Sequence, residues 1–200
     1  MILFELTGSE DHPEYQALQI SNGERHYGFL KSIVSTSLAM GRPFLSQTVM
    51  KAINYHAIAC LHTNAGEYRP CDVSVGDYRP PEPYRINALM EDFVNMVNRR
   101  WDSADPVELS AFVLWRLNAI HPFINGNGRT ARAASYFALC CKLDGWLEGE
   151  RILPELLREN RSEYVTALKA ADVSAVSGAV DLSLLHELIA RLLTLQVGEE

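Results

Sequence analysis

The residues best suited to chemistry stand together in His121–Arg132, which reads HPFINGNGRTAR. Gly126 and Gly128 predict a turn whose backbone N–H groups can converge on an anion without obstruction from Cβ atoms. The turn leads into an expected helix, and the N-terminus of a helix favours phosphate. Arg129 and Arg132 are three residues apart, so both can reach the same phosphates from one helix face. This stretch therefore predicts a phosphate cradle for a nucleotide.

A proton acceptor stands at the edge of this cradle. His121 is the titratable group there whose side chain suits proton transfer near neutral pH. Taken singly, His121 is also compatible with a capping role, and Gly-Asn-Gly with an ordinary turn. The stretch, however, separates two apolar segments, and polar groups between buried helices need partners that a ligand can supply. The combination favours a binding site with a general base.

Other motifs for catalysis or cofactor binding fit less well. An HExxH zinc motif starting at His186 lacks its second histidine, because Ala190 occupies that position. Gly126–Ala131 fits the G-x-G-x-x-A pattern of dinucleotide-binding folds. The apolar run before it is too long for a typical strand, and no alternation of strands and helices surrounds it. A dinucleotide-binding fold is therefore disfavoured.

Helical periodicity dominates the rest of the chain. Asp105 and Pro106 predict a helix start, with the aspartate as N-cap and the proline in the first turn. The segment Gly66–Pro83, rich in Gly, Pro and Asp, predicts a small hairpin or irregular loop. The pattern indicates an all-α bundle with a short β-hairpin flap. The expected helices are Asn22–Met40, Leu45–His62, Asn87–Arg100, Val107–Ile120, Arg129–Leu143, Pro154–Ala171 and Leu182–Val197.

Composition excludes several classes of protein. Among 200 residues, Lys and Arg total 18 and Asp and Glu total 25, so the formal net charge is −7. This balance argues against a nucleic-acid partner, because such proteins neutralise phosphates with clustered basic residues. No apolar run reaches the ~18 residues of a membrane-spanning helix, and the N-terminal residues lack a secretory signal pattern. We therefore expect a soluble cytoplasmic protein without a membrane partner.

The cysteines do not predict a metal site or a disulfide framework. Cys140 and Cys141 are adjacent, and the spacing to Cys60 and Cys71 fits no zinc pattern. Free cysteines are most often buried, so all four are expected to be reduced thiols in the core.

The stretch His121–Arg132 resembles the signature of the Fic family, His-Pro-Phe-x-(Asp/Glu)-Gly-Asn-Gly-Arg-x-x-Arg, and departs from it at Asn125. A looser resemblance covers residues 45–171, including a GxxR motif and flap within Gly66–Pro83. It implies a Fic-type helical bundle over 45–171, a helical arm over 1–44 and a C-terminal helix over 172–200 packed on the core.

The resemblance also implies an activity, the transfer of AMP from ATP to a Tyr, Thr or Ser hydroxyl of a target protein with Mg²⁺ or Mn²⁺. His121 would deprotonate the hydroxyl, and a buried Phe123 would anchor the loop. Asn127 would hold the α-phosphate, and the arginines would bind the β- and γ-phosphates. The implied phosphate-binding residues are Gly126, Asn127, Gly128, Arg129 and Arg132.

The flap would position the target protein in this activity. An extended target segment would pair with it as an added strand, which would place the hydroxyl over His121. The implied docking residues are Val73, Ser74, Val75 and Gly76. The partners expected are thus ATP and a protein with an accessible hydroxyl side chain, and a homodimer is left open.

Two departures from the family pattern bear on activity. Asn125 replaces the metal-binding Asp or Glu and keeps an oxygen ligand without its charge, which predicts weaker metal binding. Many members also carry an inhibitory (Ser/Thr)-x-x-x-Glu-(Gly/Asn) helix. Thr36 and Gly41 match that pattern, but Met40 replaces the glutamate. We expect the segment 36–41 to occupy the inhibitory position without its inhibitory charge.

Other functions remain compatible with the same loop. A nucleotide-binding pseudoenzyme or interaction module is favoured by Asn125, and transfer of UMP, phosphocholine or another phosphate-linked group also fits. Phosphoryl transfer of the Doc type is disfavoured, because such loops have Lys where this chain has Gly128.

Overall fold

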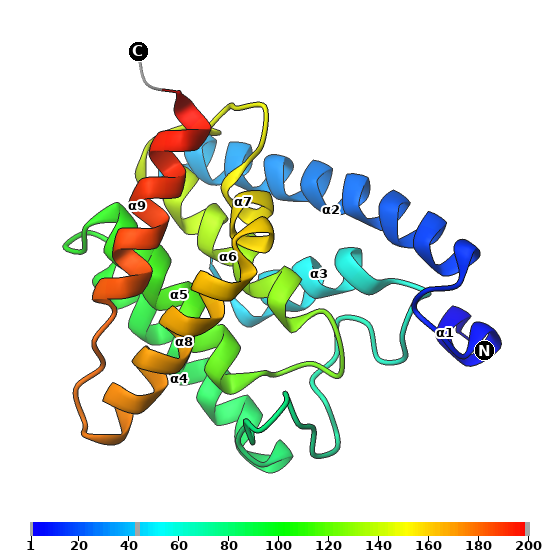
Figure 1. Cartoon of the computed structure of the whole chain (residues 1–200). Coiled ribbons are helices and arrows are strands. Elements are labelled where there is room, and N and C mark those ends of the chain that lie inside the picture. The colour runs from blue at the N-terminus through cyan, green and yellow to red at the C-terminus, as the bar shows by residue number, and fades with distance from the viewer. Residues whose placement is uncertain (1, 43–44, 199–200) are drawn as a thin grey trace.

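The computed structural model describes residues 2–42 and 45–198, which form a bundle of helices (Figure 1). The expected all-α class is confirmed. In chain order, the helices are α1 (Leu3–Thr7), α2 (Pro13–Met40), α3 (Gln47–Ile58), the 3₁₀ turn η1 (Pro83–Arg85), α4 (Ile86–Arg100), α5 (Pro106–Ile120), α6 (Asn127–Lys142), α7 (Leu153–Glu159), α8 (Arg161–Val176) and α9 (Ser183–Val197).

The core is built around α5 and α6, which are buried on most sides as their apolar sequences predict. Asp105 caps α5 as expected, and its carboxylate accepts hydrogen bonds from Val107 N at 2.9 Å and Glu108 N at 3.1 Å. In the described part of the chain, no helix combines the length and apolar character needed to cross a membrane.

Small residues let α5 and α6 approach closely. Ser110 and Ser135 are fully buried, and their hydroxyl oxygens are 2.7 Å apart. Each hydroxyl oxygen is also within hydrogen-bond distance of the carbonyl of the other residue, at 3.2 Å from Ser110 and 3.0 Å from Ser135, so the two hydroxyl protons are shared among these contacts. These reciprocal bonds satisfy two buried polar groups at the interface, where larger side chains would not fit.

The long helix α2 crosses α3 and α6 and begins earlier than expected. Pro13 stands in its first turn, and the His12 ring accepts a hydrogen bond from Glu14 N at 3.3 Å as an N-cap. The expected start at Asn22 was therefore wrong. The residues before Asn22 are mostly exposed, so they carry little of the apolar periodicity on which that expectation rested.

The single helix expected over Pro154–Ala171 was also wrong, because the chain breaks at Asn160 between α7 and α8. The Asn160 amide donates to Leu156 O at 2.8 Å, and Asn160 N donates to the same oxygen at 3.0 Å. Asparagine side chains compete in this way for backbone groups and so end helices. The next helix, α8, continues to Val176, past the boundary expected after residue 171. The boundary expected at residue 44 lies outside the described residues.

The segment between α3 and η1 contains a turn and isolated bridges. Val75 and Tyr78 exchange two backbone hydrogen bonds of 3.1 Å across a turn that contains Gly76. Gly76 has a φ of +58°, which glycine adopts without strain. Among the described residues, the flap is therefore one closed turn within an irregular loop, in line with the small hairpin or irregular loop that the sequence predicts.

The expectation of four core cysteines is right for Cys140 and Cys141 and wrong for the other two. Cys60 is exposed and follows α3 with a φ of +63°, and Cys71 is exposed in the flap. Both lie in loops, where the tendency of free cysteine to be buried does not apply.

Replacing Ser135 by leucine tests the close approach of α5 and α6. We expect Ser135→Leu to lower the free energy of unfolding by about 1–3 kcal/mol, because the larger side chain overpacks the interface. The matched control is Ser162→Leu on the exposed side of α8, where we expect a change within about 0.5 kcal/mol. Denaturant unfolding measures both, and equal effects would contradict this description of the interface.

Candidate functional site

The polarity of the 121–132 stretch is explained by its place beside a cavity of about 790 Å³. The cavity is bounded by the end of α5, the start of α6, part of α2, and α7 and α8. His121, Gly128, Arg129 and Arg132 all line it. The structure therefore brings together the residues that the sequence predicts as base and phosphate cradle.

His121 ends α5 in the left-handed region, with a φ of +50°. Its backbone is fixed on both sides, because His121 N donates to Leu117 O at 3.0 Å and His121 O accepts from Arg69 Nε at 2.8 Å. Burial lowers the pKa of the imidazole to about 4, against a hydrogen bond to the Asn118 backbone that raises it. The ring is therefore neutral near pH 7 and has a nitrogen able to accept a proton.

Phe123 and Asn127 close the loop between the two helices. Phe123 is 1% exposed, as predicted for a loop anchor. The Asn127 side chain accepts from Phe123 N at 2.9 Å and donates to Phe123 O at 2.8 Å. Both polar ends of this amide are therefore engaged within the loop. The Asn127 side chain thus stabilises the turn in the described structure.

Gly126 precedes α6 in the left-handed region, with a φ of +77°. A Cβ atom there would come within 2.7 Å of Ile58 and 3.0 Å of Asn54. Asn54 is fully buried and donates to Asn125 O at 2.9 Å and Thr130 Oγ1 at 3.1 Å. Glycine at this position lets the loop pack directly against α3.

The start of α6 presents free backbone donors. Asn127, Gly128 and Arg129 are its first residues, and N–H groups in the first turn of a helix have no partner within the helix. The helix begins two residues earlier than the sequence suggested, so Gly128 belongs to its first turn. A Cβ atom at Gly128 would come within 3.3 Å of Arg132 Nη1. The absence of a side chain keeps this end of the helix accessible to an anion.

Two guanidinium groups line the same cavity from α6. Arg129 donates to Ala57 O and to Asn125 Oδ1, each at 3.2 Å. Burial lowers the pKa of Arg132, which faces Tyr164, yet arginine stays protonated in proteins. Together with the start of α6, the pair gives the cavity a strongly cationic end that suits a polyphosphate.

Arg69 joins the flap to the loop, and it was not singled out from the sequence beyond the GxxR pattern. Its side chain is 2% exposed and donates to His121 O at 2.8 Å, to Cys71 O at 2.9 Å and to Pro81 O. The signal available in the sequence was an arginine in a Gly- and Pro-rich segment. Asn54 was also missed, although it interrupts an otherwise apolar helix face.

The expected docking residues occupy the exposed side of the flap. Ser74, Val75 and Gly76 are exposed and Val73 is half-buried. Tyr78 ties this turn to the end of α5, because its hydroxyl donates to Ala119 O at 2.7 Å. The flap is thus held near His121 while its outer face stays accessible.

The segment 36–41 does not reach the cavity. Thr36 bonds within its own helix to Ser32 O at 2.9 Å, and Met40 is 53% exposed. Ser37 lies close to Cys141, which is nine residues beyond Arg132 and so about 14 Å further along α6. The expectation that this segment occupies an inhibitory position is therefore wrong. The part of α2 that lines the cavity comprises Gln19, Ile20, Gly23, Glu24, His26 and Tyr27.

His26 is a buried imidazole in this wall of the cavity. It is 4% exposed, and its Nε2 has no hydrogen-bond partner. Burial lowers its pKa to about 3, helped by the charges of Arg129, His56 and Arg132. The ring is therefore neutral in the folded protein at ordinary pH.

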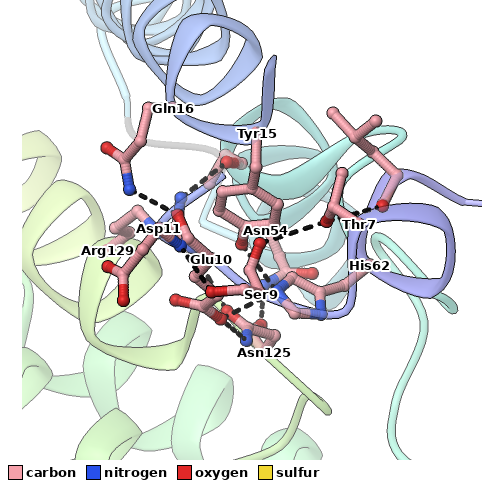
Figure 2. A network of polar contacts seen from close by, with 12 residues as sticks. Thr7, Ser9, Glu10, Asp11, Tyr15, Gln16, Asn54, His62, Asn125 and Arg129 are labelled. Carbon is pink, nitrogen blue, oxygen red and sulfur yellow. Dashed lines mark hydrogen bonds and ion pairs between the residues drawn. The ribbon is translucent and has the colours of Figure 1, made fainter. Parts of the chain in front are cut away.

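Asn125 lies beside the phosphate cradle with both ends of its amide engaged. Its Oδ1 accepts from Arg129, and its Nδ2 donates to Glu10 Oε1 at 3.3 Å (Figure 2). No cluster of three or more His, Cys, Asp or Glu residues able to hold a metal occurs within the described ranges. The oxygen atoms of Asn125 and Glu10 are nevertheless of the kind that Mg²⁺ and Mn²⁺ prefer, and phosphate oxygens would complete such a site.

The sequence of the chain is similar to proteins of one family. Residues 44–139 match the family model described as the Fic/DOC family. The chain is 36% identical over 92 residues to "Protein adenylyltransferase Fic" of Drosophila willistoni, which covers 44% of this chain and 18% of that protein. It is 43% identical over 89 residues to the Drosophila ananassae protein of the same name, with coverage of 42% and 18%. The matched region is thus less than a fifth of these relatives' length.

Solved structures show the same fold. A Fic domain containing signaling protein from Bacteroides thetaiotaomicron has a TM-score of 0.67 at 23% identity, covering 96% of this chain and 74% of that chain. Fic-1 from C. elegans has a TM-score of 0.69 at 21% identity, with coverage of 86% and 47%. IbpAFic2 covalently tethered to Cdc42 has a TM-score of 0.60 at 17% identity, with coverage of 92% and 59%. At these identities, the likeness shows the fold alone.

The buried His26 predicts a pH dependence of stability. The folded pKa of about 3 lies below the ordinary value of 6.5, so between these values the unfolded chain binds a proton that the folded chain does not. The stability linked to this group is therefore complete above pH 6.5 and is lost as pH falls toward 3. We expect His26→Leu to reduce the pH slope of the free energy of unfolding by up to about 1.4 kcal/mol per pH unit in that window.

Chemical denaturation between pH 4 and pH 8 measures this slope. Above pH 7 the curves for wild type and His26→Leu should run parallel, which provides an internal control. An unchanged slope below pH 6 would mean that the histidine is accessible to protons in the folded state.

Proposed function

Because the chain belongs to the Fic/DOC family through residues 44–139, we propose that it transfers AMP from ATP to a hydroxyl side chain (Tyr, Thr or Ser) of a target protein. The relatives named protein adenylyltransferase support AMP transfer at the level of the family. The observation that carries the proposal for this chain is the meeting of His121, the start of α6, Arg129 and Arg132 at one cavity.

The proposed reaction uses His121 as the general base. Its neutral ring accepts the proton of the target hydroxyl as the oxygen attacks the α-phosphorus of ATP. The bond between the α-phosphorus and the bridging oxygen breaks, and pyrophosphate leaves. The products are an AMP ester of the target side chain and pyrophosphate, with the proton on the imidazole. Arg69 fixes the backbone carbonyl of His121, and the hydrogen bond between the ring and the Asn118 backbone keeps the accepting nitrogen in place.

The proposed roles of the phosphate-binding residues follow from charge and position. The backbone N–H groups of Asn127 and Gly128 bind the α-phosphate at the start of α6, where the helix dipole favours negative charge. Arg129 and Arg132 bind the β- and γ-phosphates and neutralise the leaving pyrophosphate. Positioning and charge neutralisation are the main requirements of this kind of transfer.

A divalent cation would accompany the triphosphate. Asn125 stands in the position of the family's acidic ligand and offers a neutral oxygen toward Mg²⁺ or Mn²⁺. The cation would supply further neutralisation of charge on the phosphates.

The flap would select the target. Val75 and Tyr78 close the turn, and the adjoining backbone around Val73 and Ser74 makes no backbone hydrogen bond within the described structure. An extended segment of a target can pair with such a free edge. The structure of IbpAFic2 covalently tethered to Cdc42 supports engagement of a protein partner by this fold.

The proposal is tested with ATP labelled at either the α- or the γ-phosphate, incubated with a cell lysate and Mg²⁺ or Mn²⁺. We expect protein labelling from the α-position only, and a loss of about 10²–10⁴-fold in His121→Ala, since a general base contributes rate enhancement of that size. The matched control is His186→Ala, at a partly exposed position that does not line this cavity.

Other outcomes identify the alternatives. Label transferred from the γ-phosphate would show phosphoryl transfer. Measurable ATP binding without label from either position would favour a pseudoenzyme, in which the neutral Asn125 leaves the site without turnover. Undiminished labelling by His121→Ala would exclude this histidine as the base.

A further inference from the structure

The loop between α5 and α6 (residues 121–126, here the motif loop) forms a hydrogen bond with a carboxylate from a segment 115 residues away in the chain. Glu10 lies between α1 and α2, and its Oε1 accepts a hydrogen bond from Asn125 Nδ2 at 3.3 Å (Figure 2). The same oxygen is 3.0 Å from His62 Nε2. Asn125 in turn accepts from Arg129, so the contacts run from Glu10 to the phosphate-binding end of the cavity.

The placement of Glu10 is supported from several sides. Leu3 N and Phe4 N donate to Cys60 O and Leu61 O at 3.0 and 3.1 Å, which fixes α1 against the chain that follows α3. At the other end, Tyr15 is fully buried, and its hydroxyl lies 2.7 Å from His62 Nε2. The segment that carries Glu10 is therefore held at both ends. Glu10 itself is half-exposed and lines the cavity, so a ligand in the cavity can reach its carboxylate.

The negative charge of Glu10 makes it a suitable ligand for a divalent cation. Divalent cations that accompany nucleotides are usually held by one or two carboxylates together with phosphate oxygens. The motif loop offers a neutral amide at residue 125. Four carboxylates line the cavity, those of Glu10, Glu24, Glu155 and Asp172. Of these, Glu10 is the one that hydrogen-bonds the motif loop in the described structure.

We propose that Glu10 supplies the negatively charged oxygen ligand of the cation that accompanies the triphosphate, in place of a carboxylate at residue 125. The inference rests on the proposed function, since it assumes a nucleotide bound at Arg129 and Arg132. It assigns the arm before α2 a direct part in forming the site. The contact with Asn125 holds the Glu10 carboxylate beside the loop before the cation binds.

The test measures binding of Mn²⁺ by electron paramagnetic resonance in the presence of a non-hydrolysable ATP analogue. We expect Glu10→Gln to weaken Mn²⁺ binding by about 10–100-fold, because substitutions around metal ligands have effects of this size and this one removes a charge at the ion itself. The matched control is Glu24→Gln, an exposed carboxylate on α2 at the rim of the same cavity, which should bind Mn²⁺ as wild type does. Circular dichroism of each variant without metal verifies folding.

A double variant places the carboxylate back on the motif loop. We expect Glu10→Gln with Asn125→Asp to recover most of the lost Mn²⁺ affinity, since the charge returns to the same neighbourhood. When a chelator removes divalent cations, the Glu10→Gln variant should bind the ATP analogue at least as tightly as wild type, because the substitution removes negative charge near the phosphates.

Three results would overturn the inference. Unchanged Mn²⁺ affinity in Glu10→Gln would leave the carboxylate without a role at the cation. Equal weakening in Glu10→Gln and Glu24→Gln would assign the effect to the overall charge of the cavity. Failure of Asn125→Asp to restore binding would show that the two positions do not serve the same ion. The proposed AMP transfer would be unaffected by any of them, because it fails or stands on the His121→Ala labelling result.

Discussion

The side chain of Asn127 closes back on both backbone polar groups of Phe123, and the rest of the site depends on this contact. This contact lets the chain turn between two buried helices while the backbone polar groups of Phe123 stay hydrogen-bonded. Unpaired polar groups in a buried loop would destabilise the fold. With the turn set, the end of α5 and the start of α6 face one cavity. The imidazole of His121 and the first N–H groups of α6 then lie on the same side of the molecule.

Buried polar side chains from outside the motif hold this loop in place. Arg69 bonds carbonyl oxygens of the loop and of the flap, and Asn54 bonds the loop from α3. Both residues are almost completely inaccessible, so each hydrogen bond is protected from competition with water. Rigid support of this kind matters where catalysis requires groups to be positioned before the substrate arrives. The N-terminal arm adds a wall to the cavity through α2 and a carboxylate through Glu10.

Much of the fold could be predicted from the sequence, because helical periodicity is strong in α4 and because α5 and α6 are apolar on most sides. The ends of other helices depend on local competition that periodicity does not report, as at Asn160, whose side chain takes the Leu156 carbonyl. The residues of the 121–132 motif could be identified from the sequence because they are contiguous. Asn54 and Glu10 could not be identified in this way, since their roles arise from contacts across 71 and 115 residues of chain.

The segment 36–41 shows that a matching sequence motif can also suggest a wrong position in the fold. It matches most of an inhibitory motif, yet it lies near Cys141, at the far end of α6 from Arg132. The length of α2 explains this, because 28 residues of continuous helix bring its first half, and not its end, to the cavity. Position along a helix thus decided which residues reach the site.

A crystal structure with a non-hydrolysable ATP analogue would show whether this cavity binds a triphosphate for attack at the α-phosphorus. We expect the α-phosphate at the N-terminus of α6, the two outer phosphates on Arg129 and Arg132, and a ring nitrogen of His121 facing the side from which a hydroxyl would attack. An empty cavity, or an analogue bound with its phosphates away from these arginines, would contradict this expectation.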